Sequence, residues 1–347
     1  QLRDDDDLSL VAGLTARHRE LLRGKGVSTL AALGALPNAA KIDGLVPQTL
    51  DRIRHQARLQ EKGRREGAPS YELILPTAPA PGKPREEEGL LILPPPSRGD
   101  LFVDLEGDPL AMPGGIEYLI GVTEGATGSF TAFWGTDRAG EKRAFHDFMS
   151  LVVARRKEDP DLHLYHYAAY EPSAFKRLAA RHGIFEEELD ELLRKKVFVD
   201  LYRAVRQGIR ASVESYSIKK LEPLYGYQRK ADLRDAGSCL VAMATWFDRK
   251  TTEAPDDALK ATIAAYNEDD CASTLALRGW LEERRAELEA KVGALPRPEP
   301  GTDASEEKAK QNADVAAVEA ALKLGISEEP SERSPEERAK WLLADLL

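Results

Sequence analysis

Residues 101–109, LFVDLEGDP, place two acidic side chains at the end of a short run of strand-forming residues. Because side chains alternate along a strand, Asp104 and Glu106 project from one face and Leu105 from the other. A glycine and Pro109 then end the strand, since proline cannot donate a ladder hydrogen bond. Two like charges so close repel each other, so the pattern predicts a pair of carboxylates that share one positively charged partner at the rim of a sheet.

Around this stretch, residues 99–290 alternate short apolar runs with amphipathic segments. The apolar runs predict strands at 101–105, 116–123, 129–134 and 162–166. The amphipathic segments predict helices at 139–156, 171–182, 186–195, 217–224, 237–248 and 256–289. Three strands followed by a helix, a strand and more helices predict an α/β domain, with a mixed sheet covered on both faces.

The flanking regions differ in composition. Residues 8–67 show apolar residues at helical spacing and carry more basic than acidic side chains. Two segments, 76–98 and 296–310, are rich in proline and charge, as linkers are. We therefore expect a small helical region, a linker, an α/β domain and a second linker with the start of further helices, at 1–70, 71–98, 99–290 and 291–347.

The overall composition is that of a globular protein of 347 residues with a net charge of −10. The negative charge argues against a nucleic-acid partner unless positive side chains gather locally. Cys239 and Cys271 form no spacing typical of zinc sites or disulfide frameworks. No stretch of about 18 apolar residues is present, so we expect no membrane partner and a cytoplasmic location.

A second acidic cluster lies in AAYNEDDCASTLALRGWLEERR, residues 264–285. On a helix, Tyr266 and Asp270 are one turn apart and share a face, whereas Glu268 and Asp269 point elsewhere. Nearby leucines indicate that part of this helix faces the core and carries Asp270 toward the sheet. A solvated acidic patch is the simpler interpretation of the charge run when it is taken alone.

A third acid stands in LHLYHYAAYEPSAFKRLAARHG, residues 162–183, where a strand meets a helix. Glu171 lies in the first helical turn, where the helix dipole favours an acid and proline is at home. His166 ends the strand and is equally well explained as a core histidine. A structural role therefore accounts for both residues as well as a functional one does.

Together and in this order, the clusters resemble the DEDD exonuclease superfamily of the RNase H-like fold, in its tyrosine-bearing subclass. That family carries Asp-x-Glu on the first strand, an acid after a later strand and Tyr-x-x-x-Asp on the last helix. The matching residues here are Asp104 and Glu106, Glu171, and Tyr266 and Asp270. The segments VFVDLYR (197–203) and SVESYSIKKLEPLYGY (212–227) resemble the stretches between the last two motifs. The resemblance covers about residues 99–287 and departs from the family at one acid, where Glu171 and His166 replace the usual Asp and Asn.

The resemblance implies an RNase H-like mixed sheet flanked by helices, and two Mg²⁺ or Mn²⁺ ions, which prefer carboxylate ligands. Asp104 would bridge the ions, Glu106 and Asp270 would complete one site, and Glu171 would support the other. Tyr266 would orient or help deprotonate the attacking water. The implied activity is that of a divalent-metal-dependent 3′–5′ exonuclease on single-stranded or frayed DNA. Two alternatives stay open: a catalytically weak or inactive nucleic-acid-binding module, and an RNA-processing nuclease.

The sequence also offers candidate nucleic-acid contacts. Residues 24–33, GKGVSTLAAL, resemble a helix-hairpin-helix turn, whose backbone amides can receive a phosphate, although a helical spacer without a ligand fits equally well. Lysines after residue 217 could neutralise phosphate charge near the metal site, or could lie on a solvated helix face. The candidates are Lys219, Lys220, His166, Lys25, Arg54 and Arg58.

The segments YHYAAYEPSAFKRLA, GVSTLAALGAL and RIRHQARLQ are similar to the middle of RecB-like nuclease and helicase fusion proteins. The sequence starts at Gln1 and stops within an apolar-periodic run that opens with a capping-box pair, Ser334 and Glu337. We therefore expect a piece of a longer polypeptide, with a RecB-like nuclease domain before it and a helicase domain after it.

Overall fold

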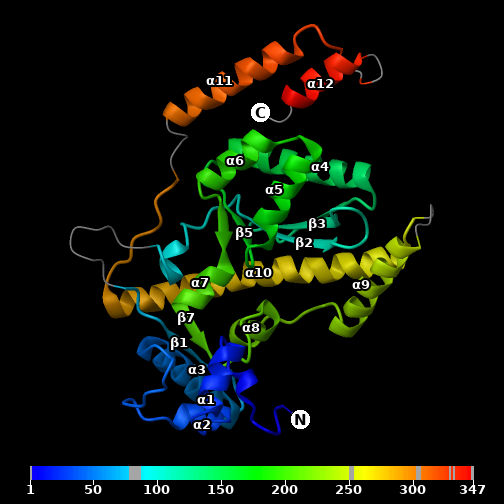
Figure 1. Cartoon of the computed structure of the whole chain (residues 1–347). Coiled ribbons are helices and arrows are strands. Elements are labelled where there is room, and N and C mark those ends of the chain that lie inside the picture. Colours follow the sequence, from blue (N-terminus) through cyan, green and yellow to red (C-terminus); the bar gives the residue numbers. More distant parts are fainter. Residues whose placement is uncertain are drawn as a thin grey trace. The chain divides into compact units, whose positions relative to one another are not determined.

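The structure is a computed structural model that describes residues 2–77, 87–249, 254–301, 306–327, 330 and 333–344 (Figure 1). The chain divides into two compact units. The first comprises Gln1–Leu192 with Val197–Glu299, and the second Leu193–Lys196 with Pro300–Leu347. Among the described residues, none of the helices combines the length and the apolarity needed to cross a bilayer.

The first unit is built on a five-stranded mixed sheet with the order β4-β3-β2-β5-β6. The strands are β2 (Leu101–Asp108), β3 (Ile116–Glu124), β4 (Phe130–Trp134), β5 (Leu164–His166) and β6 (Phe198–Asp200). The β2, β3 and β4 strands pair antiparallel, whereas β5 runs parallel to β2 and β6. The central strand is therefore β2, whose apolar side chains are buried.

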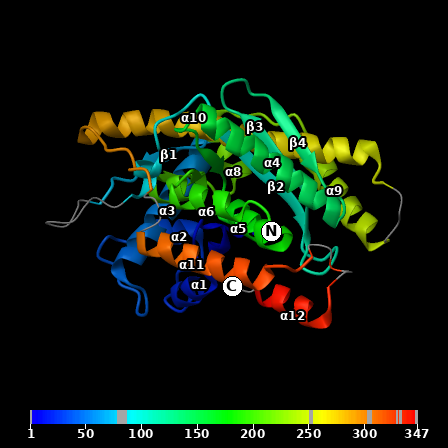
Figure 2. The same cartoon turned by 90° about the horizontal axis from the view of Figure 1, so that it is seen from above.

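Helices cover both faces of this sheet. They are α4 (Arg138–Glu158), α5 (Tyr170–His182), α6 (Glu186–Arg194), α7 (Leu201–Gly208), α8 (Ile218–Tyr225), α9 (Leu233–Asp248) and α10 (Asp257–Val292). The α4 and α5 helices lie on one face and α10 crosses the other, with α9 beside its N-terminal half (Figures 1 and 2). The predicted α/β fold with a mixed sheet flanked by helices is confirmed.

A glycine lets α10 approach the sheet closely. Gly121 on β3 pairs with Asp104 on β2. A β-carbon at Gly121 would lie only 1.6 Å from Oδ1 of Asn267 on α10, so any larger residue would displace the Asn267 amide. This close contact places the α10 residues 266–270 directly above the acidic end of β2.

The N-terminal region is helical, as predicted, and has its own core. Its elements are a 3₁₀ turn η1 (Leu8–Leu10) and the helices α1 (Ala16–Arg23), α2 (Leu30–Ala35) and α3 (Pro47–Glu66). They bury apolar side chains such as Leu22, Leu30 and Ile53 against one another. The short strand β1 (Tyr71–Leu73) then pairs antiparallel with β7 (Ile209–Ala211), and a 3₁₀ turn η2 (Gly89–Ile92) follows.

The second unit contains α11 (Glu306–Lys323) and α12 (Pro335–Ala344). The predicted capping box opens α12. The Glu337 backbone N–H donates to Oγ of Ser334 over 3.3 Å, and the Ser334 backbone N–H donates to Oε2 of Glu337 over 2.7 Å.

All predicted strands and helices of residues 99–290 are present, with shifted ends. The strand β2 continues to Asp108 through a register shift after Glu106, and α9 starts at Leu233, four residues before the predicted position. Periodicity gave no indication of α7, β1 or β7. The two strands have only three residues each, too few for alternation to be recognised, and α7 spans only about two helical turns. The segment that resembled a family strand, VFVDLYR, contains β6.

A buried carboxylate, Asp100, joins the start of β2 to β5 and α10. It is fully buried, and it accepts hydrogen bonds from the backbone N–H groups of Ser97 (2.9 Å) and His163 (3.0 Å). Nη1 of Arg278 on α10 donates over 3.0 Å to Oδ2 of Asp100, the oxygen that also accepts from Ser97.

We expect Asp100→Ala to lower the free energy of unfolding by about 3 kcal/mol or more, because the change leaves the Arg278 guanidinium buried without its partner. Urea unfolding measures the difference. As a control, Lys291→Ala breaks an exposed pair with Glu287 and should cost less than about 0.5 kcal/mol. Equal unfolding midpoints for wild type and Asp100→Ala would contradict the structural role of Asp100.

Candidate metal centre

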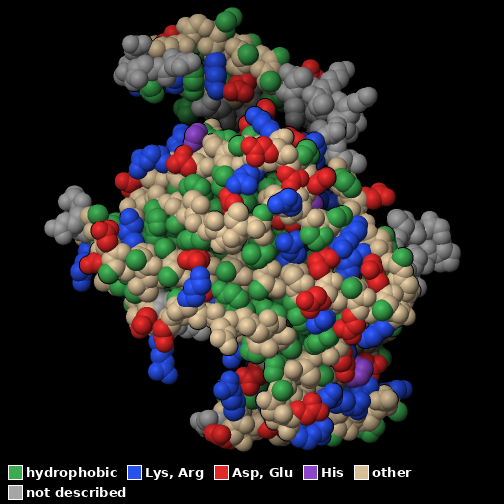
Figure 3. All heavy atoms as spheres, turned by 180° about the vertical axis from the view of Figure 1, so that it is seen from behind, with side chains coloured by type: hydrophobic (Ala, Val, Ile, Leu, Met, Phe, Trp, Pro, Cys, Tyr) green, Lys and Arg blue, Asp and Glu red, His purple; other side chains and the backbone are tan. Residues whose placement is uncertain are grey.

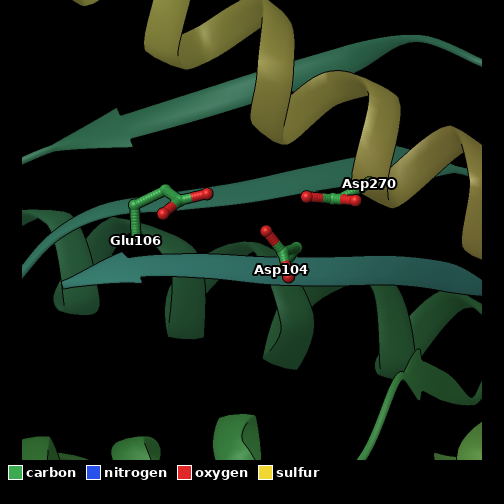
Figure 4. A group of neighbouring side chains, drawn as sticks. All are labelled: Asp104, Glu106 and Asp270. Atoms are coloured by element: carbon green, nitrogen blue, oxygen red, sulfur yellow. The ribbon is translucent and has the colours of Figure 1, made fainter. Parts of the chain in front are cut away.

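Three acidic residues predicted from the sequence converge on one point. Asp104 and Glu106 extend from β2, and Asp270 descends from α10 toward them (Figure 4). One carboxylate oxygen from each lies within 4.8 Å of those of the other two. Two distant segments of the chain therefore contribute to a single cluster of oxygen donors.

Burial and neighbouring carboxylates disfavour the charged forms of Asp104 and Glu106. Burial, followed by the charges of Asp270, Glu106 and Glu171, raises the pKa of Asp104 well above its ordinary value. Burial, then Asp270, raises the pKa of Glu106 to about 8. Lys219 opposes both shifts but does not cancel them. Without a cation, the cluster therefore retains protons at neutral pH.

Glu171, the fourth predicted acid, lies beside the three without belonging to their closest group. It occupies the first turn of α5 and is only 3% exposed. Its Oε2 is 3.4 Å from Nδ1 of His166 and has no hydrogen-bond partner among the described residues. A buried carboxylate oxygen without a donor is costly, so this atom is well suited to receive a cation.

The turn that leads from β5 into α5 is held in an unusual conformation. Ala168 has a positive φ of 79°, which is uncommon for a residue with a β-carbon. Its N–H donates to Oδ1 of Asp200 over 2.9 Å, and its carbonyl oxygen contacts Nδ1 of His166. His166 is thus a buried residue that shapes this loop and contacts Glu171.

Tyr266 lies one turn before Asp270 on α10, as predicted. Burial and the charges of Asp270, Glu106 and Asp104 raise its pKa, so the phenol stays neutral near pH 7. The ammonium of Lys219 donates a hydrogen bond to the phenol oxygen and lies 4.5 Å from the centre of the ring. The structure therefore places Lys219 at the candidate site, while Lys220 is exposed and lies near Glu214.

Two further residues hold the carboxylates and were not predicted from the sequence. Asn267, which is fully buried, donates from Nδ2 to Oδ2 of Asp104 over 2.7 Å. Arg229 donates from Nη2 to Oδ1 of Asp270 over 2.6 Å and also binds Glu222. The spacing of three between Asn267 and Asp270 was a usable signal, whereas Arg229 comes from a loop with no recognisable pattern.

The acidic run 268–270 is not a solvated patch, so that simpler interpretation is wrong for two of its three residues. Asp269 does point away from the metal centre, but it is only 1% exposed. It accepts hydrogen bonds from the Tyr227 hydroxyl (2.8 Å) and the backbone N–H groups of Lys230 (2.9 Å) and Ala231 (2.8 Å). Asp269 thus fastens the loop that carries Arg229 to α10.

The remaining predicted nucleic-acid contacts form bonds within the N-terminal helices. Lys25 pairs with Asp43 at 2.7 Å. Arg54 is buried and binds the Pro37 carbonyl oxygen and Asp51. Arg58 donates to the carbonyl oxygens of Gly34 (2.6 Å) and Leu36 (2.7 Å). The two arginines therefore brace α3 against the end of α2.

The model of the RNase H superfamily matches residues 101–282, a little over half of the chain. The match runs from the first residue of β2 into the second half of α10, and so includes all four acids described above. No curated protein and no solved structure matches the chain. With its mixed sheet and its carboxylates on the central strand and the last helix of the sheet domain, the chain belongs to the RNase H superfamily.

Proposed function

We propose that the chain is a divalent-metal-dependent nuclease that hydrolyses phosphodiester bonds. The observation that carries this proposal is the convergence of Asp104, Glu106 and Asp270 within 4.8 Å on the central strand and the helix above it. Membership of the RNase H superfamily supports it, because such folds typically use divalent metals to act on nucleic acids.

The donor set fits a hard cation. All three converging ligands are carboxylates, which Mg²⁺ and Mn²⁺ prefer to nitrogen or sulfur. Asp104, Glu106 and Asp270 would hold one ion, and Glu171, with its unpartnered Oε2, would hold a second together with Asp104. When bound, the ions supply positive charge that stabilises the phosphate during hydrolysis.

The other residues of the site can orient the carboxylates and the attacking water, and can neutralise phosphate charge. Asn267 engages one oxygen of Asp104, and Arg229 engages one oxygen of Asp270, so each carboxylate keeps an oxygen available to a cation. The neutral hydroxyl of Tyr266 can position the attacking water by a hydrogen bond. The ammonium of Lys219, beside that hydroxyl, can pair with a phosphate oxygen.

The finer assignment rests on the sequence resemblance. We propose 3′–5′ exonuclease action on single-stranded or frayed DNA, membership of the tyrosine-bearing DEDD subclass, and a setting within a RecB-like nuclease and helicase fusion. Glu171 in place of Asp agrees with this proposal, because its longer side chain lies buried next to Asp104.

We expect Asp104→Asn and Asp270→Asn to lower the cleavage rate roughly 100- to 1000-fold, since several kcal/mol of transition-state stabilisation depend on these carboxylates. The assay uses single-stranded DNA and RNA labelled at either end, with Mn²⁺, and the label position reports polarity. Glu268→Gln, in the same acidic run, is the matched control and should keep its activity. Identical products from wild type and both Asn variants would refute the nuclease assignment and leave a binding module.

Metal binding should release protons. The Glu106 carboxyl, with a pKa of about 8, is protonated at pH 7 and must ionise to bind a cation. The apparent affinity for Mn²⁺ should therefore rise by up to about tenfold per pH unit and level off above pH 8. Calorimetric titrations at pH 6 to 9, in two buffers of different ionisation enthalpy, measure affinity and proton release together. An affinity that does not change with pH would contradict this prediction.

The same shift affects stability in the presence of a chelator. The Glu106 carboxyl has a pKa of about 8 in the folded protein and of 4.5 in the unfolded chain. Between these pH values the folded state keeps a proton that the unfolded state has lost, so the free energy of unfolding falls as pH rises toward 8. The unfolding temperature of chelated protein should fall across that range, and Mn²⁺ should restore it at pH 8.

Arg229→Gln should lower the cleavage rate about 10- to 100-fold, because residues that orient metal ligands typically contribute that much. Circular dichroism checks that the variant folds, and the metal affinity of each variant is measured in parallel. The control is Lys230→Gln, which alters only the exposed neighbour that pairs with Glu268. Full activity in Arg229→Gln would show that Asp270 needs no such partner.

A further inference from the structure

Three arginines meet where the N-terminal helices join the sheet domain. We call Arg52 of α3, Arg206 of α7 and Arg210 of β7 the arginine cluster. A β-carbon placed on Gly13 would lie 3.2 Å from Nη1 of Arg52 and 3.3 Å from Nη2 of Arg206. Two guanidinium groups from opposite sides of the junction therefore converge above one glycine.

The cluster has very little compensating negative charge. Among the described residues, Arg52 and Arg206 form no ion pair, and Arg210 has only the half-exposed Glu72, 3.4 Å away. Burial and the charges of Arg206 and Arg210 lower the pKa of Arg52. Arg52 and Arg17 also contribute to a lowered pKa of the neighbouring His18. The fold thus holds like charges together, and an anion would relieve the repulsion.

A buried tyrosine fixes Arg206 in place. The guanidinium of Arg206 stacks over the ring of Tyr216, 4.6 Å from its centre. The Tyr216 hydroxyl donates to Oε1 of Gln56 (3.1 Å) and accepts from the Ala211 N–H (3.0 Å). Because Gln56 also donates to the Ala211 carbonyl oxygen over 2.8 Å, the junction is locked by hydrogen bonds. The positive groups are therefore already positioned for a ligand.

The chain connects this junction to the metal centre. Tyr167 follows His166 in the chain, and its hydroxyl donates to the Tyr216 carbonyl oxygen. Lys219, which contacts Tyr266, follows Tyr216 by only three residues, a backbone span of at most roughly 11 Å. Basic side chains also gather over the N-terminal helices at the bottom of the back view (Figure 3). The arginine cluster and Lys219 therefore flank the same short segment of the chain.

We propose that the arginine cluster binds backbone phosphates of the nucleic-acid strand that enters the metal centre. The proposal rests on the proposed nuclease function for the identity of the ligand. Guanidinium groups suit phosphodiesters, because their paired N–H groups match two phosphate oxygens. The contact is made to phosphates alone, so it favours no base sequence.

The test measures binding of labelled single-stranded DNA, and of RNA in parallel, by fluorescence anisotropy in EDTA over a range of salt concentrations. The double variant Arg52→Gln/Arg206→Gln should bind about tenfold more weakly at low salt. Its slope of log affinity against log salt should be shallower by about 1.4, since each lost single-strand phosphate contact removes about 0.7. Lys62→Gln/Arg65→Gln, on the exposed end of the same helix, makes the same change in charge and should keep the wild-type slope.

Two further readouts separate charge from folding. The double glutamine variant should unfold at the wild-type temperature or above it, because it removes like-charge repulsion. Arg52→Lys/Arg206→Lys keeps both charges and should retain most of the salt dependence. A lysine variant that binds as weakly as the glutamine variant, or a glutamine variant that binds like wild type, would overturn the proposal.

The outcome is independent of the cleavage assay. A protein that binds DNA through the cluster but cleaves nothing would refute the nuclease and retain the phosphate site. If the protein cleaves DNA but the arginine variants bind DNA as tightly as the wild type, the nuclease is supported and the phosphate site is refuted.

Discussion

The mutual repulsion of buried carboxylates is the constraint on which the rest of this structure depends. Asp104, Glu106 and Asp270 lie close together, and burial alone already disfavours the charged forms of Asp104 and Glu106. Such an arrangement persists only if positive charge or protons offset the repulsion. The packing of α10 against the acidic end of β2 thus creates the carboxylate cluster in which we propose that a cation binds, and the superfamily match gives that cluster its chemical context.

The surrounding residues reduce this cost without removing it. Arg229 and Lys219 bring positive charge to Asp270 and Tyr266, and Asn267 binds Asp104 with a neutral amide. None of these groups stands between the carboxylate oxygens of Asp104, Glu106 and Asp270. The pKa of Glu106 therefore still rises to about 8. The neighbours therefore orient the cluster, and the remaining repulsion between its carboxylates is what the proposed divalent ion would offset. The close approach at Gly121 makes this possible, because it brings Asn267 within reach of β2.

The sequence contained enough information for the sheet, the long helix and the converging acids, since alternation in 101–105 and the four-residue spacing from Tyr266 to Asp270 are local patterns. It did not reveal Arg229, because the loop that carries it is placed by Asp269 through contacts formed only in the folded chain. Arg54 and Arg58 show the opposite difficulty. Their positive charge suggested a nucleic-acid surface, but in the fold they donate to carbonyl oxygens at the end of α2 and in the turn that follows it. Charge is visible in a sequence, whereas a partner that satisfies the charge is not.

That distinction also explains how a protein with a net charge of −10 can present a site for phosphates. Other basic side chains of the N-terminal helices, such as Lys25 with Asp43, are paired, and an exposed pair contributes little field at physiological salt. Arg52 and Arg206 differ because they come from separate elements and meet only after α3 docks on β7. The positive potential around these arginines therefore arises from the packing of α3 on β7, and the overall amino-acid composition does not reveal it. The packing that joins the N-terminal helices to the sheet domain also brings the two arginines together. The helices therefore contribute to the proposed phosphate binding through their attachment to the sheet domain.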